Sequence, residues 1–290
     1  FQAGLAKCPN HPGLLHFYIH TAQFAGDSKA AAGAATTLAS FTLPSEDSHL
    51  THMPGHTFFD LGLYAQALDV GQRSVAMDYA DFDCCHPGYY SAPRYYHSHN
   101  VEFLVYALIQ NGRASETVAV AERADDPSLI ERALVAAQDW QGVIALPYTK
   151  NDDAAATFTR ALAFAKLGEN DKAKATLANL PAVSAAKPYR TAIESAMRSS
   201  VLAQIALNQH DDANALTLLE TASTDAARGD RLVGIREMPT LYYYSPHLAL
   251  AELAMKRNNI DVARAALNVE LQESPKSPAA TAALAKLNGA

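Results

Sequence analysis

The sequence predicts an all-α protein in which pairs of antiparallel helices stack into a solenoid. Three observations lead to this fold class. Alanine and leucine dominate, convincing strand alternation is absent, and a unit of amphipathic helix, short Gly or Asn break and second helix recurs. With 290 residues, of which 49% are hydrophobic, the chain can bury a substantial core, and its composition argues against disorder.

Five short breaks mark the expected turns between paired helices. They are Leu61-Gly62, Asn111-Gly112, Leu167-Gly168, Asn208-Gln209 and Asn258-Asn259. Gly and Asn readily take the left-handed conformation that ends a helix. Alanines follow each break, and such small residues let two antiparallel helices approach closely.

The helices expected from this pattern can be placed in chain order. Single helices lie near residues 12–25, 28–41, 50–62, 65–80, 96–111 and 114–124. Further helix pairs lie near 127–145, 153–179, 188–226 and 240–272, with a capping helix from about 278. Loops are expected around 43–48 and 81–93, and the second contains Pro87, Gly88 and Pro93, which cannot continue a helix.

We expect one solenoid over residues 1–290, with histidine-rich repeats at 10–110 and the remaining repeats with a C-terminal cap at 111–290. The chain begins with Phe1, and residues 1–12 have the composition of a helix end. We therefore expect an N-terminally truncated or processed chain. The sequence predicts a soluble protein but does not distinguish a bacterial cytoplasmic from an exported location.

Composition argues against several classes of partner. The net charge of −7 disfavours nucleic acid and anionic membranes. No apolar stretch reaches the ~18–20 residues of a membrane-spanning helix. The chain also lacks CxxC, phosphate-loop, dinucleotide and GxSxG motifs, so the sequence gives no support for the corresponding chemistries.

Histidines are concentrated in the N-terminal third, where nine of the 11 precede residue 100. Six of them form three pairs, each in the first helix of a predicted helix pair. The pairs are His16 and His20, His52 and His56, and His97 and His99. Spacing of i, i+4 places two imidazoles on one helix face, which suits chelation of a metal, and the first helices of a solenoid line its concave surface.

We therefore predict a transition-metal site formed by these six histidines, with Asp60 and Glu102 as possible oxygen ligands. Imidazole ligands favour copper, iron or zinc, as one or two ions, over magnesium or calcium. The sequence leaves open a coupled dicopper centre, two three-histidine sites, one metal site beside substrate-binding histidines, or non-covalent haem. Because Pro54 is expected in the first turn of a helix, His52 is a candidate for the loop before it.

A groove for a substrate or partner is expected beside the histidines. Its candidate residues are Arg94, Tyr95, Tyr96, Tyr243 and His247. Aromatic and basic side chains there would stack on a ligand or attract an anion. The competing hypothesis is a non-catalytic scaffold that binds a peptide or partner protein in the groove. Whether the protein is an enzyme stays open.

The chain resembles tetratricopeptide (TPR) repeats, in which Leu-Gly, Tyr and a later Ala recur about every 34 residues. The best match runs from Phe58 to Tyr64 and continues to Ala67. Residues 10–20, 52–58 and 95–103 further resemble a bacterial TPR-repeat family with the motifs NHPGxxHxYIH, HMPxH and YYxHN.

The resemblance implies a right-handed superhelix of helical hairpins and no particular activity. This chain departs from the family motifs at Gln23, Ser98 and Glu102, where they have Glu, Pro and His. A Glu in place of a His can still bind a metal, so the site would keep its metal with an altered set of ligands.

Overall fold

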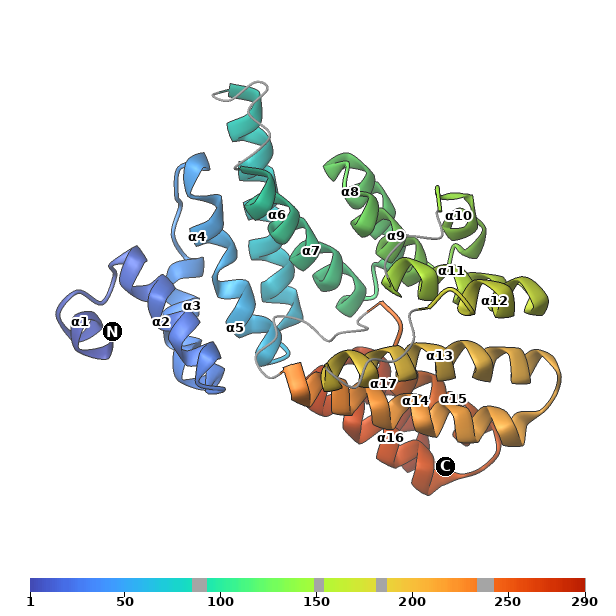
Figure 1. Cartoon of the computed structure of the whole chain (residues 1–290). Helices are drawn as coiled ribbons and strands as arrows, with labels where there is room; N and C mark the ends of the chain where they lie inside the picture. Colours follow the sequence, from blue (N-terminus) through green and yellow to red (C-terminus); the bar gives the residue numbers. More distant parts are fainter. Residues whose placement is uncertain (85–92, 149–153, 181–186, 234–242, 290) are drawn as a thin grey trace. The chain divides into compact units, whose positions relative to one another are not determined.

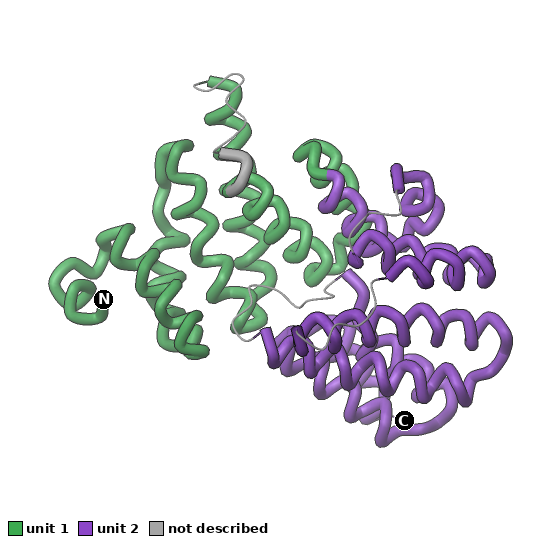
Figure 2. The backbone as a smooth tube through the Cα atoms, in the orientation of Figure 1, with its two compact units in different colours: residues 1–126 green, residues 127–290 purple. Residues whose placement is uncertain are grey.

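A computed structural model describes residues 1–84, 93–148, 154–180, 187–233 and 243–289. Of residues 93–95 it describes the backbone only. Every helix or strand element within these ranges is a helix (Figure 1), which confirms the all-α class. The chain divides into two compact units, residues 1–126 and 127–290, coloured separately in Figure 2. The single solenoid over the whole chain stays a prediction.

The first unit consists of helices packed as successive hairpins. Its α-helices are α1 (Gln2–Lys7), α2 (Pro12–Phe24), α3 (Ala32–Ala39), α4 (Ser48–His52), α5 (Pro54–Asp60), α6 (Tyr64–Cys84), α7 (Pro93–Gln110) and α8 (Thr117–Ala124). Helix α2 packs against α3, α4 and α5 pack against α6, and α7 packs against α8. The first helices of these hairpins also contact one another, α2 with α4 and α5, and α4 with α7.

The second unit repeats the helix-pair organisation. Its α-helices are α9 (Pro127–Ala136), α10 (Trp140–Ala145), α11 (Ala154–Lys166), α12 (Asn170–Leu177), α13 (Pro188–Asn208), α14 (Asp212–Val233), α15 (Pro246–Lys256), α16 (Ile260–Glu273) and α17 (Pro278–Gly289). Buried alanines such as Ala215, Ala251 and Ala263 lie where α14, α15 and α16 pack, because small side chains permit close approach.

Local sequence signals explain where many helices begin and end. Gly62, Gly112 and Gly168 have φ values of 64°, 72° and 80°, so each predicted Gly break is a left-handed turn. Asn258 has φ 57°, and at the remaining break the left-handed residue is His210, just after the predicted Asn208-Gln209 pair. All five predicted breaks are therefore confirmed.

Several helix boundaries differ from the sequence expectation, among them the end of α6 and the start of α5. Helix α6 continues to Cys84 because residues 81–84 contain no Gly or Pro, so the predicted loop does not begin at Asp81. His52 lies in α4 and not in a loop, because Met53 keeps helical angles (φ −51°, ψ −39°) and joins α4 directly to α5. Pro54 is tolerated there because the first residue of a helix does not use its amide hydrogen.

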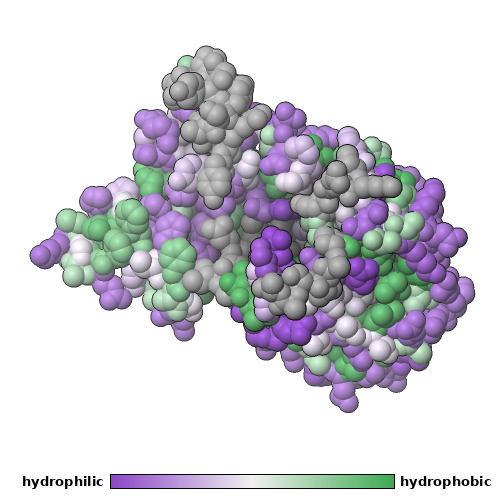
Figure 3. Space-filling model, in the orientation of Figure 1, coloured by the Kyte–Doolittle hydropathy of each residue, from purple (hydrophilic) through white to green (hydrophobic). Residues whose placement is uncertain are grey.

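The surface mixes polar and apolar residues, and Figure 3 shows one face of it with apolar patches among hydrophilic side chains. No described helix is both long and apolar enough to cross a lipid bilayer. Among the described residues the exposed large hydrophobic side chains are Phe1, Phe17, Phe24, Tyr96, Leu232 and Val233.

Candidate metal centre

A buried group of three histidines forms where α4, α5 and α7 meet. The Nε2 atom of His52 lies 3.1 Å from the Nε2 atoms of both His56 and His99. His52 and His56 come from the adjoining ends of α4 and α5, and His99 comes from α7. Because Met53 preserves the helical path, His52 and His56 keep the spacing that places both rings on one face.

Hydrogen bonds among these rings alone do not satisfy the three nitrogens. An imidazole nitrogen carries either one proton or one lone pair in the ring plane, so His52 Nε2 can form a well-aligned hydrogen bond with only one of its two neighbours. His56 Nδ1 is also buried without a hydrogen-bond partner. A cation that accepts several lone pairs at once suits this convergence, as ligand nitrogens at about 2.0–2.1 Å surround a bound zinc ion.

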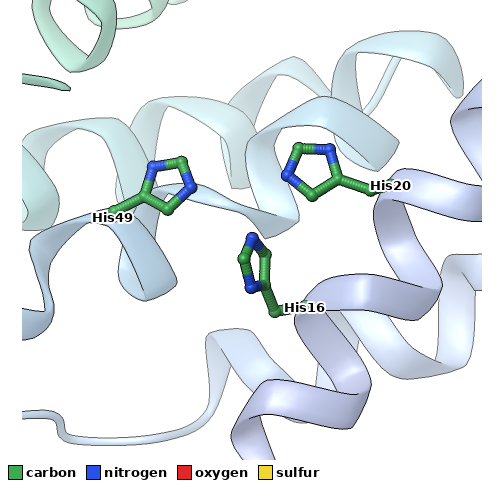
Figure 4. A group of neighbouring side chains, drawn as sticks. All are labelled: His16, His20 and His49. Carbon is green, nitrogen blue, oxygen red and sulfur yellow. The ribbon is translucent and has the colours of Figure 1, made fainter. Parts of the chain in front are cut away.

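A second group of three histidines lies between α2 and α4. Figure 4 shows His16 and His20 projecting from one helix toward His49 on the other. Ring centroids are 4.8 Å apart for His16 and His20, and 5.3 Å apart for His16 and His49. His16 Nε2 and His49 Nδ1 are buried without hydrogen-bond partners. In each group, one ligand nitrogen per histidine lies within 4.8 Å of the other two, so each group could hold a metal ion.

The two groups adjoin each other. The rings of His20 and His56 are 5.7 Å apart, and those of His49 and His52 are 6.0 Å apart. These separations between the groups are similar to the 4.7 to 6.4 Å separations within them. The six side chains therefore form one continuous cluster.

The Phe103 side chain packs against all three histidines of the buried group. The Phe103 ring lies 4.4 Å from His52, 4.6 Å from His56 and 4.8 Å from His99 between centroids. His52 and His56 are each 1% exposed, and Phe103 is 2% exposed. The apolar surroundings fix the ring orientations and keep bulk water from competing for the nitrogens.

Burial keeps the cluster uncharged. Burial, and then the neighbouring histidines, lower the pKa values of His52 and His56 well below the usual 6.5. The same causes lower the pKa values of His49 and His99 to about 4. Burial also lowers the pKa values of His16 and His20. Neutral imidazoles at pH 7 offer the lone pairs that a metal ion requires.

His97, which was predicted as a ligand, is not part of either group. Its Nδ1 pairs with Asp78 Oδ2 at 2.9 Å, and the same carboxylate oxygen accepts a 2.9 Å hydrogen bond from Asn100 Nδ2. Residues at i and i+2 point about 200° apart around a helix, so His97 and His99 cannot face the same ion. Only His99 turns toward α4 and α5.

His49 takes the sixth position and was missing from the predicted ligand set. Its spacing was the available signal, because His49, His52 and His56 stand at i, i+3 and i+7 along one continuous helical path. Asp60 accepts a hydrogen bond from Ser28 Oγ and belongs to neither group. Glu102 also belongs to neither group.

The residues predicted to line a groove lie in different parts of the structure. Tyr96 packs against His49 with ring centroids 4.5 Å apart and ring planes tilted by 48°. The side chains of Arg94 and Tyr95 lie outside the described residues. His247 is 2% exposed and bonds Ser223 Oγ at 2.7 Å, so it lies in the core of the second unit and not at a groove.

Tyr243 is 8% exposed and lines a cavity of about 450 Å³ within the second unit. The cavity is also lined by Arg132, Tyr148 and Arg160. The Arg160 guanidinium donates to the backbone oxygens of Leu146 and Ile144, which accounts for its position there.

No family model matches the chain, and no curated protein matches it significantly. The resemblance to the TPR-repeat family therefore stays a prediction.

Proposed function

We propose that this chain is a metal-binding, TPR-like protein whose six clustered histidines hold two transition-metal ions in adjacent three-histidine sites. The observation that carries the proposal is the convergence of the Nε2 atoms of His52, His56 and His99. The unpartnered buried nitrogens of His16 and His49 support it, since buried polar atoms ordinarily have partners. The ligands of the second ion are His16, His20 and His49.

Copper is the metal that we place first. Both groups consist of neutral imidazoles and include no carboxylate. Non-haem iron sites commonly include a carboxylate, whereas copper and zinc accept imidazole ligands alone, and copper(II) binds most tightly in the divalent series. Three protein ligands leave an open coordination position, which is the condition for a catalytic metal site.

The TPR-like arrangement supplies the scaffold in this proposal. The hairpins of the first unit have first helices that contact one another, and these helices carry all six histidines. In a helical solenoid such first helices line one surface, so ligands from successive hairpins converge. A single hairpin supplies at most part of either site.

The test is the metal content of the full chain, purified without a histidine tag or chelator and measured by mass spectrometry. We expect about two equivalents of copper, which follow from two three-ligand sites. His52→Ala and His16→Ala should each remove about one equivalent, because each disrupts a different site. His210→Asn is the matched control, since His210 is exposed and left-handed (φ 60°), a conformation that Asn tolerates.

Two results would contradict the metal centre. Metal-free protein that also fails to take up added copper, zinc or iron(II) would leave a scaffold whose histidine-lined surface binds a peptide or partner protein. A haem absorption band in freshly purified protein would instead assign the histidines to axial ligation of haem iron.

A further inference from the structure

The two histidine groups differ in their access to solvent. All three members of the group formed by His16, His20 and His49 are half-buried. In the other group only His99 is half-buried, and His52 and His56 are each 1% exposed. A molecule arriving from solvent therefore reaches the group formed by His16, His20 and His49 first. If the cluster accepts an outside ligand, this group supplies the open coordination position.

Each histidine of this accessible group is in contact with an exposed aromatic ring. Phe17 stacks on His16 with centroids 4.8 Å apart, and Tyr96 lies 4.5 Å from His49. Phe24 stacks on His20 at 5.9 Å, with an angle of 13° between the ring planes. Phe17, Phe24 and Tyr96 are 51%, 60% and 48% exposed. We call these three side chains the aromatic rim.

Exposed large hydrophobic side chains are concentrated at the aromatic rim. Six large hydrophobic side chains are exposed among the described residues, and four of them belong to this region, namely the rim and Phe1, which stacks on Phe17. Exposed apolar residues usually lie scattered singly, and clusters mark binding sites. Because each rim residue touches a proposed ligand, the cluster is centred on the metal site.

We propose that the rim and the accessible metal site together bind a small aromatic molecule that carries an anionic oxygen, such as a phenolate. This inference rests on the proposed metal centre. Three neutral imidazoles leave the charge of the ion uncompensated, so an anionic oxygen is the favoured additional ligand. The ring of the bound molecule would then stack against the rim, where aromatic pairs prefer centroid separations of about 4.5–7 Å.

The experiment compares two probes on the copper-loaded full chain. 4-Nitrophenolate offers an oxygen donor on an aromatic ring, whereas azide occupies the same coordination position without a ring. Phe24→Ala and Tyr96→Ala should each weaken 4-nitrophenolate binding by about threefold to tenfold, the loss expected for one aromatic contact. Azide affinity and copper content should stay at the wild-type values. Leu232→Ala is the control, because Leu232 is a 51% exposed apolar residue of the second unit.

The outcomes separate the two proposals. Wild-type protein without copper overturns the metal centre, and this inference with it. Copper-loaded protein in which the rim variants bind both probes as the wild type does overturns the aromatic site alone. Stable dimers in light scattering that dissociate in Phe24→Ala would also overturn it, because the rim would then be an interface between two copies.

Discussion

At the scale of single residues, Asp78 stands out because it is buried and holds two side chains of another helix. Its Oδ2 accepts from Asn100 and pairs with His97, and the carboxylate is 6% exposed. His99 lies between those two residues on α7. A buried carboxylate needs such partners, and here they also fix the rotation of α7. Asp78 is therefore a positioning residue for His99.

Asp78→Asn should weaken copper binding at the His52, His56 and His99 site by about tenfold to a hundredfold, as for other residues that orient ligands. Copper at the second site and the helix content should not change. A chelator competition that resolves the two sites measures this. Asp69→Asn is the control on the same helix, since the Asp69 side chain is 63% exposed. Equal weakening of both sites would show a general loss of structure instead.

The ligand set also shows what could and could not be predicted from residue identity. Four of the six clustered histidines follow from sequence spacing, because the i, i+4 pairs His16 and His20, and His52 and His56, each share a face. Which of His97 and His99 faces the cluster could not be predicted, since it depends on how α7 is rotated against α6. A partner such as Asp78, 19 positions away from His97, fixes that rotation.

At the scale of helices, the order of elements was predictable because Gly and Asn breaks are local signals. The direct junction of α4 and α5 at Met53 was not predictable. A proline in the first turn of a helix is compatible with either a loop or another helix before it. Close packing was only partly predictable. A Cβ added at Gly229 in α14 would lie 2.7 Å from Ile193 Cγ1 of α13, a contact that neither helix reveals alone.

Gly229→Ala should destabilise the second unit by about 1–3 kcal/mol, because the added methyl overpacks the α13–α14 interface and outweighs the gain in helix propensity. Chemical denaturation followed by circular dichroism measures it. Gly33→Ala in α3 is the control, since nothing lies within 4 Å of its added Cβ. If the two variants are equally stable, α13 and α14 are not packed as described.

At the scale of the whole molecule, the lowered histidine pKa values make the metal-free protein sensitive to acid. The unfolded chain takes up protons near pH 6.5, whereas in the folded chain the pKa values of His49 and His99 are about 4. Between these values the unfolded state binds more protons, so stability falls as pH falls. Above pH 6.5 these groups contribute no dependence on pH.

We expect the denaturant concentration at the unfolding midpoint of the metal-free protein to decrease as the pH is lowered from 6.5 to 4. His49→Asn should reduce this fall, because one group with a lowered pKa is removed, and His210→Asn should leave it unchanged. Midpoints measured at intervals of pH test this. A fall of the same size in His49→Asn and in the wild type would exclude His49 as a source of the acid sensitivity.

The distribution of the histidines over α2, α4, α5 and α7 has a consequence for the timing of assembly. During synthesis the chain emerges from its N-terminus, so His16 and His20 are available long before His99. Neither site is complete within one hairpin, and the buried one needs residues 47 positions apart to meet. Loading with both ions therefore reports that neighbouring hairpins have already docked. Bound metal would link neighbouring hairpins through shared ligands. Hairpins that would otherwise open one at a time would then open together as one cooperative unit.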